Sequence, residues 1–257
     1  VHGDDLVIAT NGRGFYIMDD ISALRQMQGV DTDSVTLFKP AAAIRARPAT
    51  FTGTPLPKDE PMAANPPDGA YIDYVLPASV SGAVNLTVLD AQGHTVRSFS
   101  SADPVQKPDP AKLEFAPEWV PPPSRLVTTP GMHRFVWDLH YAAQSGHAAA
   151  GRRGRGGGVW APPGQYTVQL QVAGKDYRQA LEVQPDPRVH VSPAALQREF
   201  ELARKVEAAS LRAAQADARA GRLLKQLAAL GQPADAGLAS AISSLSANIE
   251  DISGMDS

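Results

Sequence analysis

Two adjacent carboxylates, Asp19 and Asp20, are the first residues whose types and spacing could do chemistry. Glycoside hydrolysis needs a pair of carboxylates that flank the scissile bond. Neighbouring residues of an extended strand point to opposite faces, so these two side chains cannot face one sugar together. We therefore expect Asp19 and Asp20 to cap a short helical turn and to pair with Arg13 or Arg25.

Histidine and serine offer little further chemistry in this chain. No two histidines have the spacing of metal ligands on a helix, and no Gly-x-Ser-x-Gly motif is present. His133 and His140 lie seven apart on a predicted strand, and therefore on opposite faces. We expect no catalytic residue, no metal site and no cofactor. The six histidines are His2, His94, His133, His140, His147 and His190.

The glycine- and arginine-rich run 151–158 is the one local basic feature. Arg152, Arg153 and Arg155 could hold phosphate, but no aromatic residues are interleaved with them, and no Gly-Lys-Ser/Thr follows. The whole chain has a net charge of −3 and a pI near 6.1. We expect a flexible loop between two strands here and no nucleic-acid partner.

Five aromatic residues could form a platform on which a sugar ring stacks: Trp119, Trp137, Trp160, Tyr71 and Tyr74. A platform of this kind needs two or three exposed rings on one face. Trp137 falls at an inward position of a predicted strand, so we expect it in a core. Trp119 and Trp160 lie in or near loops and remain the candidates for carbohydrate contact.

Short strands and turns dominate the first three quarters of the sequence. Proline and glycine are both enriched, cysteine is absent, and no apolar run of about 18 residues could span a membrane. Six segments read as strands, of which 83–89 alternates most regularly, and they predict an all-β sandwich. An Asn11-Gly12 turn also predicts a hairpin within 4–20. The six strand segments are 70–76, 83–89, 95–99, 132–141, 165–172 and 176–183.

The last quarter has a helical pattern. Ser192-Pro193 is a helix start, and apolar residues then recur at steps of four and three to residue 230. A second seam of the same rhythm runs from 238 to 252. We expect an antiparallel helical hairpin that closes on its own alanine-rich seam and is cut short near Ser257. The division is therefore 1–47, a Pro-rich linker at 48–68, the sandwich at 69–185 and the helical hairpin at 192–257.

Residues 5–27 resemble the last blade of bacterial sortilin-like BNR-repeat β-propellers, which are often described as glycosyl hydrolases. The match consists of a Gly-Arg-Gly turn between two strands and an Asp-Asp pair before a short helix, although Asn11 replaces the usual histidine. The resemblance covers about a tenth of the chain and implies that 1–47 is the remnant of a terminal blade. The matching residues are Gly12, Arg13, Gly14, Asp19 and Asp20.

The predicted sandwich resembles a FlgD-like immunoglobulin-type module. The resemblance lies in segments 86–99, 131–141 and 161–170, with Trp137-Asp138 and the Pro-Gly-x-Tyr that holds Gly164 and Tyr166. In such proteins this module follows the propeller and is regarded as a spacer or interaction domain.

Together these features predict a non-catalytic C-terminal structural and interaction segment of a secreted propeller protein. Two alternatives stay open: part of an exo-acting, sialidase-like glycoside hydrolase that braces the active site, and a carbohydrate-binding module. The resemblance implies a periplasmic or extracellular location, with any signal peptide upstream of Val1. The expected partners are the upstream propeller of the same polypeptide and a glycan or a protein.

Overall fold

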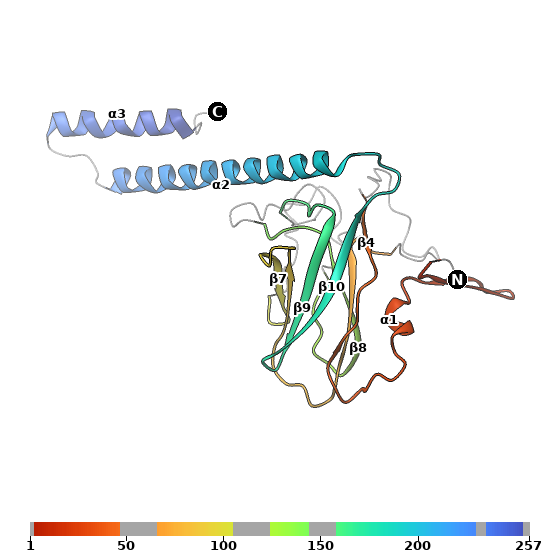
Figure 1. Ribbon diagram of the computed structural model, residues 1–257. Helices are drawn as coiled ribbons and strands as arrows, with labels where there is room; N and C mark the ends of the chain where they lie inside the picture. The colour runs from red at the N-terminus through yellow and green to blue at the C-terminus, as the bar shows by residue number, and fades with distance from the viewer. Residues whose placement is uncertain (1–2, 47–65, 105–123, 144–157, 230–234, 254–257) are drawn as a thin grey trace. The chain divides into compact units, whose positions relative to one another are not determined.

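The computed structural model describes residues 3–46, 66–104, 124–143, 158–229 and 235–253. The chain divides into two units. The first holds every strand, one short helix and the beginning of a long helix. The second holds the rest of that helix, from Leu202, and a further helix. A mainly β chain with a C-terminal pair of helices, as the sequence predicts, is confirmed (Figure 1).

A five-stranded sheet forms one side of the first unit. All neighbouring strands are antiparallel except the first pair, which is parallel. Strand β6 shows why these residues form a sheet: its apolar residues alternate with polar ones, and every second side chain is fully buried. The order is β4 (Ala43–Arg45), β10 (Lys175–Pro185), β9 (Gly164–Val172), β6 (Val84–Leu89) and β7 (Thr95–Ser100).

A three-stranded antiparallel sheet completes the unit, in the order β3 (Thr36–Leu37), β5 (Ala70–Leu76) and β8 (Gly131–Trp137). The inward residues of both sheets belong to one hydrophobic core. Trp137, Phe135 and Tyr74 are its largest buried side chains. Gly69, with a φ of +144°, precedes β5 where a Cβ would lie 2.2 Å from the Trp137 carbonyl oxygen, so only glycine fits there.

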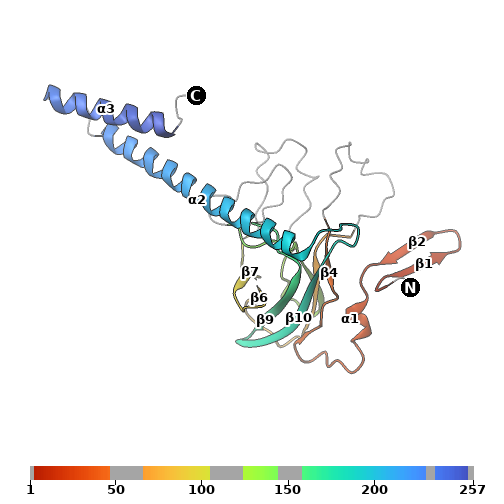
Figure 2. The same cartoon turned by 45° about the horizontal axis from the view of Figure 1, so that its top comes forward.

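Strand β5 is buried on both faces, because its outer face is covered as well. Helix α1 (Ser22–Arg25) supplies Ala23, which forms a second small cluster with Phe38 and Val75. In both ribbon views α1 lies beside the sheets (Figures 1 and 2). The strands β3 and β4 and helix α1 all come from the first 47 residues, so this stretch contributes to both sheets and to the cover of one of them.

The N-terminal hairpin pairs β1 (Leu6–Thr10) with β2 (Gly14–Met18) in the register Leu6 to Met18. Its turn is the segment that the sequence predicts, and Gly12 and Gly14 both adopt positive φ. Every residue of β2 is exposed.

Two helices make up the C-terminal region: α2 (Pro193–Ala229) and α3 (Ala236–Ser253). Both begin at a side-chain cap, because Ser192 Oγ accepts from the Ala195 N–H and Asp235 Oδ1 accepts from the Leu238 N–H. Their apolar seams are exposed: Leu223 is 42% exposed and Leu245 is 49% exposed. In the described part of the chain, neither helix is long and apolar enough to cross a bilayer.

The predicted strands agree with β5 to β10 to within a few residues, except that β8 ends at Trp137, four residues before the predicted end. Leu139 then adopts a φ of +57°, which ends the extended run. The predicted linker at 48–68 and the basic run at 151–158 lie almost wholly outside the described residues.

Tyr74 anchors the segment before β8 to the core through two hydrogen bonds with the backbone of Val127. Its side chain is fully buried, and its hydroxyl donates to the Val127 carbonyl at 2.9 Å and accepts from the Val127 N–H at 2.8 Å. Replacing Tyr74 with Phe leaves both backbone groups without this partner, so we expect a loss of about 1–2 kcal/mol in the free energy of unfolding. Urea denaturation measures it. Tyr177→Phe, at the edge of the same core, is the control, and an equal loss there would contradict this role of the hydroxyl.

Candidate functional site

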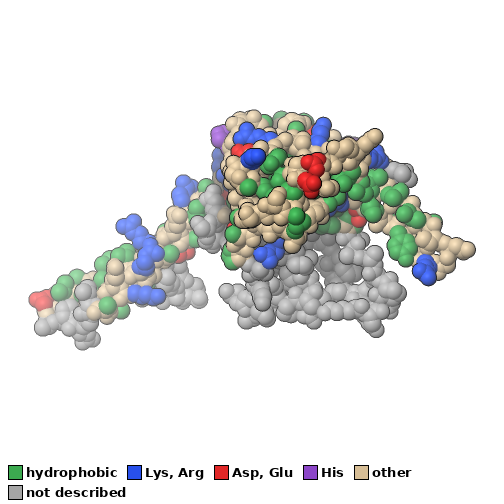
Figure 3. Space-filling view, turned by 90° about the horizontal axis from the view of Figure 1, so that it is seen from below, with side chains coloured by type: hydrophobic (Ala, Val, Ile, Leu, Met, Phe, Trp, Pro, Cys, Tyr) green, Lys and Arg blue, Asp and Glu red, His purple; other side chains and the backbone are tan. Residues whose placement is uncertain are grey.

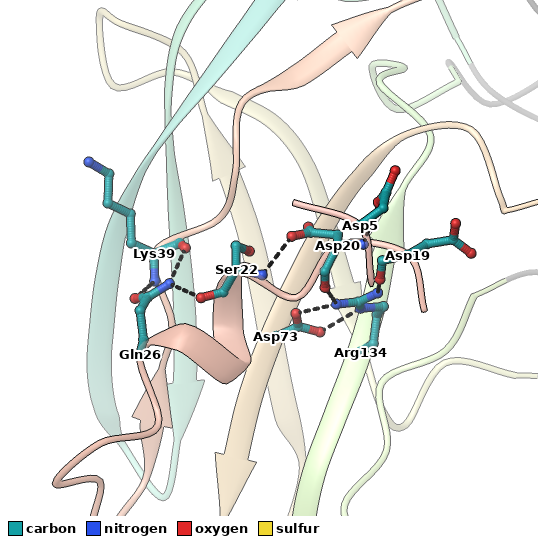
Figure 4. A network of polar contacts seen from close by, with 8 residues as sticks. All are labelled: Asp5, Asp19, Asp20, Ser22, Gln26, Lys39, Asp73 and Arg134. Carbon is teal, nitrogen blue, oxygen red and sulfur yellow. Dashed lines mark hydrogen bonds and ion pairs between the residues drawn. The ribbon is translucent and has the colours of Figure 1, made fainter. Parts of the chain in front are cut away.

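An ion pair between a buried aspartate and a partly exposed arginine lies on the outer face of the three-stranded sheet and is the centre of a network of polar contacts (Figure 4). Asp73 of β5 and Arg134 of β8 lie directly opposite each other in the antiparallel register, so their side chains share one face. Arg134 Nε and Nη2 donate to the two carboxylate oxygens of Asp73, each at 2.8 Å. Asp73 is only 4% exposed, so this bidentate contact compensates a desolvated charge.

The same guanidinium holds the chain that leads from the hairpin. Arg134 Nη1 donates to the Asp19 carbonyl at 2.8 Å, and Nη2 donates to the Asp20 carbonyl at 2.6 Å. Four hydrogen bonds therefore leave Arg134, two to a carboxylate and two to the backbone. We call the group of Arg134, Asp73, Asp19 and Asp20 the arginine latch.

Electrostatics and an aromatic ring stabilise the charged form of the arginine latch. The hydrogen bonds to Asp73 raise the pKa of Arg134 above its ordinary value. The guanidinium carbon lies 4.7 Å from the centre of the Tyr71 ring. Burial raises the pKa of Tyr71, and the charge of Asp19 adds to the effect.

Local contacts fix the backbone that the arginine latch holds. Asp20 adopts a φ of +48°, a conformation that Asp tolerates better than most residues. Its N–H donates to Asp5 Oδ1 at 3.0 Å, and its Oδ1 accepts from the Ser22 N–H at 3.0 Å. Next along the chain, the Gln26 amide exchanges two hydrogen bonds with the backbone of Lys39. The hairpin exit, α1 and the segment after β3 are therefore bonded together.

The structure differs from the expectation for Asp19 and Asp20. The N-cap of α1 is Ile21, with no side-chain cap, and Asp20 instead accepts from the Ser22 N–H two residues on, as in an Asx turn. The predicted partners are wrong: Arg25 pairs with Asp4 at 3.3 Å, and the arginine that reaches the Asp19-Asp20 segment is Arg134. Because Arg134 directs four hydrogen bonds to protein groups, the arginine latch positions the chain.

The residues of the FlgD-like resemblance come together at one end of the core. Trp137 and Tyr166 meet edge to face, with ring centres 5.5 Å apart, and the Trp137 Nε1–H donates to the His140 carbonyl at 3.0 Å. The Tyr166 hydroxyl donates to the Pro162 carbonyl at 2.6 Å, and burial raises the pKa of this tyrosine. Asp138 accepts from the His140 N–H and lies 3.5 Å from Arg97. Gly164 is the first residue of β9.

A second cluster surrounds Trp160, one of the two candidates for carbohydrate contact. The indole is partly buried and stacks on the His140 ring, with centres 5.9 Å apart and planes 8° from parallel. The guanidinium carbon of Arg45 lies 4.2 Å from the Trp160 ring centre. Protein groups therefore already stack on this ring. The other candidate, Trp119, lies outside the described residues.

Sequence reasoning missed the residues that the structure makes most interesting: Asp73, Arg134 and Arg45. An acid in the middle of the otherwise apolar strand 70–76 was a usable signal, since a buried carboxylate needs a partner. Nothing local marks Arg134 or Arg45. In the described part of the chain, no group of three or more His, Asp or Glu residues could hold a metal ion.

Comparison of the chain with protein-family models, with curated proteins and with solved structures gives no match.

Proposed function

We propose that this chain is a non-catalytic, structural and interaction segment at the C-terminal end of a secreted BNR-repeat β-propeller protein. In this proposal the β1–β2 hairpin belongs to the last propeller blade. The arginine latch joins that blade to the domain that follows.

The observation that carries the proposal is that the hairpin is apolar on both faces. Val7 and Ile17 pair on one face, and Ile8 and Tyr16 pair on the other. Their side chains are 45%, 62%, 47% and 56% exposed, in that order. The hairpin projects from the sheets as a patch of hydrophobic side chains (Figure 3).

A strand that is apolar on both faces is typical of the inside of a larger sheet that is covered on both sides. A two-stranded hairpin of this kind is marginal in water by itself. The blade of a propeller, in which several strands pair and neighbouring blades cover both faces, would satisfy the hairpin.

Two finer statements on the fold belong to the same proposal. The two sheets form a FlgD-like immunoglobulin-type sandwich, which is supported by their common core and by the contact between Trp137 and Tyr166 inside it. The helices α2 and α3 pack as an antiparallel hairpin. The apolar seams of the two helices support this packing. In one antiparallel register, each large apolar residue of one seam faces a large residue or an alanine of the other. The layers are Leu227 with Leu238, Leu223 with Ile242, Ala220 with Leu245 and Ala216 with Ile249.

Hydrogen exchange tests the blade hypothesis. We expect the amides of β1 and β2 to exchange quickly in residues 1–257 expressed alone, because only one ladder protects them. In the full-length product of the gene we expect the same amides to be protected at least about tenfold more, as inner strands of a sheet are. Amides of β9, inside the five-stranded sheet, are the control and should exchange alike in both proteins.

Equal exchange of the hairpin amides in the two proteins would rule out a blade built on this hairpin. A second measurement addresses catalysis: residues 1–257 should release no sugar from sialosides or from plant and bacterial glycans. Measurable hydrolysis would overturn the non-catalytic assignment.

A further inference from the structure

Arg45 is a buried charge at the edge of the five-stranded sheet. It follows Ala43 and Ile44 on β4, and the alternation along the strand explains its position: Ala43 is buried, Ile44 is 49% exposed, and Arg45 points inward again. Its side chain is only 8% exposed. A charge that is removed from water to this degree normally has close, well-directed partners.

The hydrogen bonding of Arg45 falls short of that expectation. Among the described residues, its single carboxylate contact is from Nη2 to Glu199 Oε1, at 3.4 Å, near the outer limit for a hydrogen bond. Its Nε is buried and has no hydrogen-bond partner in the described part of the chain. The Trp160 ring supplies attraction over the face of the guanidinium but accepts no in-plane hydrogen bond.

Two other arginines in this chain form bidentate ion pairs through the same edge of the guanidinium, its Nε and Nη2 atoms. Arg134 donates through Nε and Nη2 to the two oxygens of Asp73, both at 2.8 Å. Arg188 donates through the same two atoms to Asp186, at 2.9 Å and 2.7 Å, and holds the pKa of that carboxyl at about 2. On Arg45 the same edge makes only one long hydrogen bond among the described residues, where a bidentate carboxylate would make two short ones.

The carboxylate that reaches this edge is itself well solvated. The Glu199 side chain is 62% exposed and projects from the second turn of α2. Glu199 therefore loses little when an oxyanion takes its place, and the incoming oxyanion keeps the buried Arg45 charge paired.

Aromatic rings lie against one face of the guanidinium. The Trp160 ring centre is 4.2 Å from the Arg45 guanidinium carbon, and Trp160 stacks in turn on His140. Apolar walls lower the local dielectric and strengthen a bond between ions.

We propose that the Nε–Nη2 edge of Arg45 binds an oxyanion, a carboxylate or a phosphate group of a ligand, when Glu199 turns away. The planar fork of a guanidinium matches the paired oxygens of either group. In the absence of ligand, Glu199 bonds to Nη2 of Arg45 and partly compensates the charge of the guanidinium. The Trp160 cluster thus becomes an anion site, with Arg45 as the binding residue and Trp160 as the ring that orients it.

The test is to titrate anions into the full chain. Calorimetry measures the affinity, and the NMR signal of the Arg45 Nε–H group reports binding at this position. Sodium acetate and sodium phosphate at constant ionic strength are the two probes, and their relative affinities distinguish a carboxylate ligand from a phosphate. Glucuronate, with glucose as its neutral control, shows whether a sugar ring adds affinity. We expect saturable binding that shifts the Arg45 signal.

Three variants complete the experiment. Arg45→Lys keeps the charge but loses the fork and should weaken binding at least about tenfold. Glu199→Gln removes the competing carboxylate and should tighten binding about threefold to tenfold. Arg178→Ala, an exposed arginine of β10, should change nothing.

Two results would overturn the proposal. One is that neither the natural chain nor Glu199→Gln binds any of the probes. The other is that Arg45→Lys, shown to be folded by circular dichroism, binds as the natural chain does. If Glu199→Gln lowers stability and no anion binds, Glu199 is the permanent partner of Arg45. None of these outcomes bears on the exchange of the hairpin amides, so this site and the proposed function fail independently.

Discussion

Replacing Arg134 with methionine is expected to lower the free energy of unfolding by about 3–5 kcal/mol. The variant leaves the Asp73 carboxylate, which is 4% exposed, without its only bidentate partner among the described residues. It also removes the two hydrogen bonds to the Asp19 and Asp20 carbonyls. Urea denaturation followed by circular dichroism measures the loss, and a free energy within about 0.5 kcal/mol of the natural chain would contradict the prediction.

A double variant separates the two roles of the arginine latch. Asp73→Val combined with Arg134→Met removes both charges, so the global stability should return to near that of the natural chain. The segment after the hairpin would still lack its anchor. We therefore expect faster hydrogen exchange at the Ile21 amide, which donates to the Asp4 carbonyl at 2.6 Å. Unchanged exchange there would show that Arg134 compensates Asp73 but does not hold the hairpin exit.

Replacing Trp137 with alanine is expected to cost about 3–5 kcal/mol in the free energy of unfolding. The side chain is fully buried, meets Tyr166 edge to face and donates to the His140 carbonyl. The substitution leaves a large cavity in the core that both sheets share. It also removes the hydrogen bond that holds residue 140, where the chain pairs with Trp160.

Trp160→Ala is the matched control for this prediction. Trp160 is only partly buried and packs at the border of the core, so its removal should cost distinctly less than that of Trp137. Thermal unfolding of the two variants compares them directly. Equal losses of stability in the two variants would contradict the prediction that Trp137 contributes more to the core than Trp160.

The expectations that succeeded depended on short-range patterns. The strand over residues 84–89 follows from its alternation, and the start of α2 follows from Ser192-Pro193, since each signal lies within a few residues of the structure it determines. The hairpin turn at Asn11 to Gly14 is of the same kind. Trp137 was expected in a core from its position in a strand, and it is buried.

The candidate sites were less predictable, because their partners are far apart in the chain. Asp73 and Arg134 are separated by 61 positions, and Arg45 and Glu199 by 154. No local sequence pattern predicts which charged residues on different elements will pair. The predicted pairing of Asp19 and Asp20 with Arg13 or Arg25 is wrong for this reason: these arginines are near in sequence, but the arginine that reaches this segment comes from β8.

By itself, then, the sequence determined where strands, turns and helices lie, and that the chain is mainly β with a helical C-terminal region, because hydrophobic periodicity and capping act over a few residues. Only the tertiary structure decided that segments from the first 47 residues enter both sheets and that one arginine holds the hairpin exit. It also decided that another arginine is buried with its Nε unpartnered among the described residues. These outcomes depend on which strands become neighbours, and that choice is made by the burial of the whole core.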